Sequence, residues 1–175
     1  MAKPSDADNR TFFDEHLLYE IQMFRFAYGR LLDGNHDQAP ANALIECFLL
    51  HSRNLIEFFK TKDSCDFDPR DFADNFKLNK RFISDDELPR INAHLSHLSV
   101  GRTKTGVKKI GRAERKEIFK SIECELARFS GTLRSEFKAS WGPTPKYSLR
   151  EIGIDGPTPS ATNVIDFSIT GPLKT

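Results

Sequence analysis

The stretch QAPANALIECFLLHSRNLIEFFK, residues 38–60, decides the fold of this chain. On a helical wheel its charged residues fall into one narrow wedge, and apolar side chains cover most of the remaining circumference; the wedge holds Glu46, Arg53, Glu57 and Lys60. A helix that is apolar on most sides needs several neighbours to bury it. Pro40 suits the first turn of such a helix. We therefore predict a helix over residues 38–60 at the centre of a helical bundle.

Three further segments have the spacing of amphipathic helices, and they supply the expected neighbours. Residues 11–32 place an apolar stripe on one side, formed by Phe13, Leu17, Ile21, Phe24, Tyr28 and Leu31. Residues 84–98 and about 112–139 carry similar stripes. Asp68 followed by Pro69 predicts the start of one short helix. The predicted fold class is all-α, with four long helices in a bundle plus one short helix.

The two ends of the chain differ from this bundle in composition. We expect residues 1–10, which are polar and acidic, to be disordered. Residues 142–175 hold five of the nine prolines and four of the ten glycines, without a helical period. The predicted organisation is thus a disordered N-terminus over residues 1–10, a helical bundle over 11–140 and an irregular, extended C-terminal arm over 141–175.

The first helix has a second apolar side, formed by Phe12, Tyr19, Met23 and Phe26. A helix at the surface of a bundle is polar on the side that faces water. Two apolar sides therefore indicate two partners. We expect the second partner to be either the C-terminal arm or another copy of the chain, which would make the protein a homodimer.

The net charge of +1 conceals a strongly basic segment. Residues 102–116 contain seven basic residues and one acid, Glu114, so this segment carries +6 and the rest of the chain −5. Such a segment attracts an anionic partner locally, such as a nucleic-acid backbone or a phosphate-bearing ligand. It is no P-loop, because Val107 follows Gly106 where that motif requires lysine. The candidate anion-binding residues are Lys104, Lys108, Lys109 and Arg112.

A polar seam precedes the basic segment. Arg90, His94 and His97 border the apolar stripe of the third long helix, where a side chain is half-desolvated yet reachable. Three interpretations remain open: acid–base chemistry by His94 or His97 with Arg102 or Arg90 stabilising an anion, a metal site on the two histidines, or a structural border. The metal interpretation lacks a third ligand of recognisable spacing, so no metal and no cofactor is expected.

His51 lies inside the apolar sector of residues 38–60, where both ring nitrogens need partners or lose hydration. In the structural interpretation, His51 forms a hydrogen bond with a neighbouring polar group within the core. The functional alternative places His51 and Asn54 opposite His94 across a groove between helices, as ligand-binding residues.

The stretch ECFLLHSRNLIEFF, residues 46–59, resembles a central helix of HEPN-type domains, which occur in prokaryotic toxin–antitoxin and defence proteins. The resemblance implies a bundle of four or five helices over about residues 11–139, commonly dimeric. It also implies a metal-independent ribonuclease centre with an arginine, an adjacent polar residue and a histidine. Arg53 and Asn54 match its opening, but Phe58 occupies the histidine position. The centre is then absent, or His94 or His97 replaces that histidine.

The remaining features bear on location and class. No apolar run approaches the roughly 18–20 residues of a membrane-spanning helix, and the N-terminus lacks the apolar core of a signal peptide. The three cysteines show no paired framework, so we expect a cytoplasmic protein. The leading hypothesis is a HEPN-like binding module for an anionic partner. A metal-independent ribonuclease is the alternative and a histidine-coordinated metalloprotein the weaker one, which leaves open whether the chain is an enzyme.

Overall fold

The structure is a computed structural model, and it describes residues 3–34, 36–61, 66–96 and 109–141. The chain divides into two units, residues 1–144 and 145–175. All described residues belong to the first unit, so the predicted C-terminal arm lies outside them except for Trp141.

The described residues form helices and no strand, which confirms the all-α prediction. The helices are α1 (Asp6–Thr11), the π-helix η1 (Phe12–Leu17), α2 (Leu18–Asp33), α3 (Gln38–Lys60), α4 (Pro69–Phe72), α5 (Glu87–Ser96), α7 (Arg112–Thr132) and α8 (Ser135–Lys138). Within the described part of the chain, no helix is both long and apolar enough to cross a membrane.

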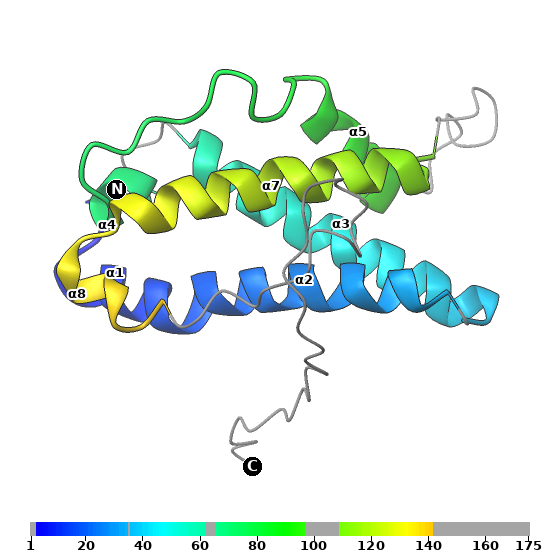
Figure 1. Ribbon diagram of the computed structural model, residues 1–175, viewed down its shortest axis with the longest axis horizontal. Helices are drawn as coiled ribbons and strands as arrows, with labels where there is room; N and C mark the ends of the chain where they lie inside the picture. The colour runs from blue at the N-terminus through cyan, green and yellow to red at the C-terminus, as the bar shows by residue number, and fades with distance from the viewer. Residues whose placement is uncertain (1–2, 35, 62–65, 97–108, 142–175) are drawn as a thin grey trace, which may run out of the picture. The chain divides into compact units, whose positions relative to one another are not determined.

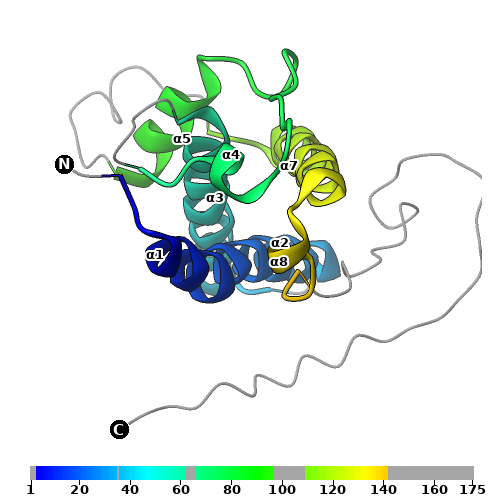
Figure 2. The same cartoon turned by 90° about the vertical axis from the view of Figure 1, so that its left-hand side faces the viewer.

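Helix α3 has the predicted bounds and lies between α2, α5 and α7 (Figures 1 and 2). Its side chains Phe48, Leu49, Leu55 and Ile56 are fully enclosed. Phe24 of α2 stacks against both Phe48 and Phe119, and this stack joins three of the helices. Arg53 and Glu57 pair on the exposed wedge, as their spacing predicts.

The N-terminal helix begins earlier than predicted. Residues 6–33 are helical throughout, so the expectation of disorder is wrong for residues 6–10. Ser5 and Asp8 form a capping box: the Asp8 amide donates to Ser5 Oγ (3.2 Å) and the Ser5 amide donates to Asp8 Oδ2 (2.9 Å). Arg10 then donates to Ser140 Oγ at 2.9 Å. Capping and a tertiary contact together order this start.

The last predicted helix is broken. Helix α7 ends at Thr132, and the short α8 follows after Leu133 and Arg134. The Asp74 amide donates to the Thr132 carbonyl (2.8 Å), and the Arg134 amide donates to the Phe72 carbonyl (3.0 Å). These bonds to the end of α4 and the residues after it take the place of helical hydrogen bonds, and they form an isolated bridge between Ala73 and Leu133.

The short helix α4 forms where Asp68 and Pro69 predict it, with the Asp68 side chain accepting from the Arg70 amide. It also supplies a neighbour to the second apolar side of the first helix. Phe12 stacks on Phe67 with ring centroids 4.0 Å apart, and it contacts Phe72. Of the predicted second side, Phe12 is therefore covered by the chain itself, whereas Tyr19 is 51% exposed.

Candidate functional site

The predicted site residues that the structure describes fall in two places. Arg90, His94, Lys109 and Arg112 lie where α5 meets the start of α7, and we call this region the α5–α7 junction. His51 and Asn54 lie on α3 and face α2. The other predicted residues, His97, Arg102, Lys104 and Lys108, lie outside the described residues.

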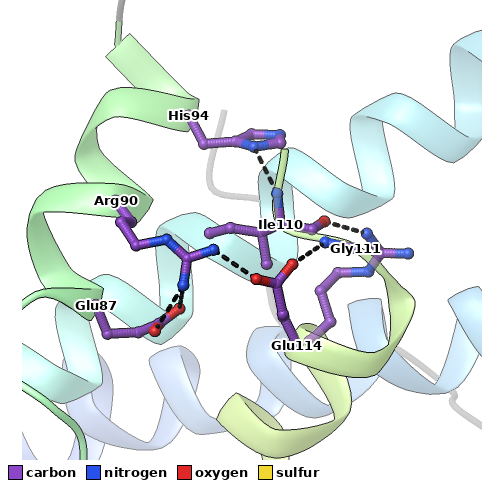
Figure 3. Close-up of polar contacts among 7 residues, drawn as sticks. Glu87, Arg90, His94, Ile110, Gly111 and Glu114 are labelled. Carbon is purple, nitrogen blue, oxygen red and sulfur yellow. Dashed lines mark hydrogen bonds and ion pairs between the residues drawn. The ribbon is translucent and has the colours of Figure 1, made fainter. Parts of the chain in front are cut away.

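Glu114 is the centre of the α5–α7 junction (Figure 3). Its Oε1 accepts from Arg90 Nη2 at 2.5 Å, and its Oε2 accepts from the Gly111 amide at 2.7 Å. The second bond satisfies one of the free amides at the start of α7, where a carboxylate also complements the helix dipole. Glu114 thus holds α5 against the N-terminus of α7.

Arg90 is engaged by two carboxylates. Besides Glu114, it pairs with Glu87 one turn earlier on α5, at 3.1 Å between Nη1 and Oε2. The hydrogen bond to Glu114, more than any other contact, raises the pKa of the Arg90 guanidinium. These contacts make Arg90 a tie between the helices, and its guanidinium is already occupied.

His94 lies beside the backbone of the basic segment. The Ile110 amide lies 3.5 Å from His94 Nδ1, a long hydrogen bond in which the ring nitrogen accepts (Figure 3). Ile110 is buried, and its carbonyl accepts from Arg115 Nη1 at 2.7 Å. Burial, more than the charge of nearby Arg112, lowers the pKa of the Arg115 guanidinium. Lys109 and Arg112 are exposed, and within the described residues neither forms an ion pair.

The second place is a polar cluster between α2 and α3, which we call the Glu20 cluster. Glu20 Oε2 lies 2.7 Å from His51 Nδ1 and accepts from Asn54 Nδ2 at 3.0 Å. Because a carboxylate only accepts, His51 Nδ1 carries the proton in this contact. The imidazole is buried, and the Tyr19 ring packs edge-on against it. His51 and Asn54 thus meet Glu20, whereas His94 lies beside the Ile110 amide.

Sequence reasoning missed Glu20. The signal was present, since Glu20 is an acid at the border between the two apolar sides of the first helix, next to Tyr19 in the sequence. A buried histidine on the neighbouring helix calls for such a partner. The register between the two helices, which decides whether they meet, is not visible in local spacing.

A groove of about 840 Å³ opens beside the Glu20 cluster. Its lining combines aromatic and aliphatic side chains with several charged ones; it consists of Phe12, His16, Leu17, Glu20, Asn54, Leu55, Glu57, Phe58, Lys60, Thr61, Asp66, Phe67 and Leu88. Phe58, which the expected HEPN-type resemblance would align with a catalytic histidine, lines this groove and also contacts Phe129 in the core. Phe58 therefore packs against the core and also contributes to the groove lining.

The described residues contain no group of three or more histidine, cysteine or acidic side chains placed to hold a metal ion. Cys47 and Cys124 are free thiols. Burial, and secondarily the charge of Glu20, raises the pKa of the Cys47 thiol.

The fold and the two sites define an all-α helical domain with a basic segment at the start of α7. No protein-family model, no curated protein and no solved structure matches this chain.

Proposed function

We propose that this chain is a HEPN-like helical binding module whose basic segment, residues 102–116, contacts the phosphate backbone of a nucleic acid. The observation that carries the proposal is the placement of charges at the start of α7. The one acid of the segment, Glu114, faces Arg90 and the Gly111 amide, whereas Lys109 and Arg112 are exposed. Exposed cations beside a helix N-terminus favour phosphate contacts that carry no base specificity.

The test is the salt dependence of binding to a fluorescently labelled single-stranded RNA and to a duplex DNA. Lys109→Ala combined with Arg112→Ala should weaken binding and make the slope of log affinity against log salt shallower by roughly 1–2, because each phosphate contact releases counterions. Lys77→Ala combined with Lys80→Ala removes the same charge from exposed positions outside the segment and should leave the slope unchanged. Equal effects of the two pairs would contradict the proposal.

A metal-independent ribonuclease is the second candidate, favoured by one observation. His94 lies within 3.5 Å of the Ile110 amide, so a histidine stands beside the proposed phosphate-binding segment. In this alternative His94 or His97 acts as general base and Arg102 stabilises the charge on phosphorus. Arg90 is a weaker choice for that second role, because Glu87 and Glu114 already engage it.

The ribonuclease alternative is tested by incubating the protein with RNA in EDTA. His94→Ala and His97→Ala are compared with His36→Ala, which changes a histidine that contacts the Arg30 carbonyl elsewhere. Loss of cleavage with either of the first two variants supports catalysis. If both variants cleave RNA at the wild-type rate, the ribonuclease alternative is contradicted.

We also propose that the chain self-associates through exposed apolar side chains of α2 and α3. Tyr19 and Leu50 are the exposed large apolar residues in the described part of the chain, and Met23 and Phe26 are half-buried on the same helix as Tyr19. Light scattering should find a dimer that Tyr19→Ser with Leu50→Ser converts to a monomer. A monomeric wild type would contradict this part. The proposed site of action is the cytoplasm.

A further inference from the structure

The groove beside the Glu20 cluster has aromatic walls. Phe12 and Phe67 stack with centroids 4.0 Å apart and nearly parallel rings, and Phe58 lies 5.8 Å from Phe12. All three side chains line the groove. Its volume of about 840 Å³ lies within the range of small-molecule sites, which combine apolar walls with a few fixed polar groups.

Glu20 is the fixed polar group of this groove. Two donors from α3, His51 Nδ1 and Asn54 Nδ2, both hold Oε2. The other oxygen, Oε1, accepts no hydrogen bond within the described residues, although Glu20 lines the groove. The carboxylate is therefore oriented before any ligand arrives, and one oxygen remains available to a donor.

The charges of the lining favour a cation. The lining contains three carboxylates, those of Glu20, Glu57 and Asp66, and one ammonium, that of Lys60. Glu57 pairs with Arg53, and Lys60 pairs with Asp85 at 2.9 Å.

The backbone beside the groove departs from ordinary helical geometry. The π-helix η1 interrupts the helix of residues 6–33, and it contributes Phe12, His16 and Leu17 to the lining. Insertions of this kind in α-helices occur frequently at functional sites.

We propose that this groove binds a small organic cation, namely a primary ammonium attached to an apolar or aromatic body. The ammonium donates to Glu20 Oε1, and the body packs against Phe12, Phe58 and Phe67. The site is separate from the basic segment, which has the opposite charge, and it does not depend on nucleic-acid binding.

The test compares 2-phenylethylamine with its neutral isostere 2-phenylethanol by isothermal titration calorimetry and by NMR. The amine should bind about tenfold more tightly or better, because a charge-assisted hydrogen bond distinguishes the two. Glu20→Gln keeps an acceptor for His51 and should abolish this preference. Glu46→Gln removes the same charge from an exposed position of α3 outside the lining and should preserve it.

A second variant keeps the test decisive if Glu20→Gln fails to fold. Leu88→Lys places an ammonium in the half-buried lining, and it should weaken the amine at least tenfold while affecting the alcohol less. Equal binding of amine and alcohol, no detectable amine binding, or unchanged preference in the folded Glu20→Gln variant would overturn the proposal. A lysine-containing tetrapeptide that binds more tightly than the amine would overturn the small-molecule assignment.

Discussion

The Glu20 cluster and the α5–α7 junction both join two helices through a glutamate, yet their surroundings differ. Glu20 meets a buried imidazole and an amide, and its neighbours are aromatic. Glu114 meets an arginine that is 36% exposed and a backbone amide at the start of a helix. The Glu20 carboxylate lies in the lining of a groove. The Glu114 carboxylate is engaged by Arg90 and the Gly111 amide, beside the exposed cations Lys109 and Arg112.

From this difference we expect a glutamate to contribute more to stability when its partner is buried. A buried donor that loses its acceptor keeps the full desolvation cost. A half-exposed arginine that loses its carboxylate regains water. Four predictions test this comparison. The first concerns the ion pair between Arg25 and Glu123, whose arginine is the most buried of those compared.

The largest expected effect is at Glu123, which forms two hydrogen bonds with Arg25, a side chain only 7% exposed. Glu123→Ala leaves a buried guanidinium unpaired, so the free energy of unfolding should fall by about 3 kcal/mol. Urea denaturation measures it. Glu117→Ala on the same helix removes an exposed partner of Lys120 and should change stability by less than about 0.5 kcal/mol. A similar loss in the free energy of unfolding for both variants would contradict the expected dependence of stability on burial.

The next effect is at Glu20. Glu20→Ala leaves the buried His51 donor and the Asn54 amide without their acceptor, and should lower the free energy of unfolding by about 2 kcal/mol. The control is Glu15→Ala, which removes an exposed acid from the same continuous helix. If the two variants denature at the same urea concentration, the Glu20 cluster does not stabilise the contact between α2 and α3.

A smaller effect is expected at Arg90. Arg90→Ala breaks the contacts with Glu87 and Glu114, and solvent screening should limit the loss to about 1 kcal/mol. The loss should shrink in high salt, unlike that of Glu20→Ala. Arg53→Ala is a matched control, because Arg53 has the same 36% exposure and, among the described residues, forms its ion pair along its own helix. If Arg90→Ala lowers the free energy of unfolding more than Glu20→Ala does, and independently of salt, the expected order of the two sites is wrong.

The smallest effect concerns Cys47. Burial and then the charge of Glu20 raise the pKa of this thiol. A raised pKa means less thiolate at a given pH, so Glu20→Gln should lower that pKa and increase the rate of alkylation by iodoacetamide. The rate–pH curve of the Cys47 peptide, followed by mass spectrometry, should move to lower pH. Cys124, which is exposed on α7, serves as the internal control and should not change.

Local spacing was enough to predict several elements. The bounds of α3 follow from its narrow charged wedge and Pro40, and α4 follows from Asp68 and Pro69. The first helix was predicted with its apolar stripe but with too late a start, because the Ser5–Asp8 capping box was not recognised. The continuous helix predicted through Leu133 was wrong, because the bridge to Ala73 is a contact between distant segments.

The candidate site divides in the same way. His51 and Asn54 were selected from their positions on α3, and the basic segment was selected from charge alone. The role of Arg90 could not be predicted, because Glu114 lies 24 residues away on another helix.

Local sequence patterns are sufficient to predict that this chain folds into helices, where most of them run, and that a cationic segment lies at the start of α7. Periodicity and capping act over a few residues, so they can be read along the chain. The tertiary structure alone decided that Glu20 meets His51 and Asn54, and that Glu114 turns toward Arg90. The physical reason is that packing sets the register between helices, and that register determines which buried donor finds which acceptor.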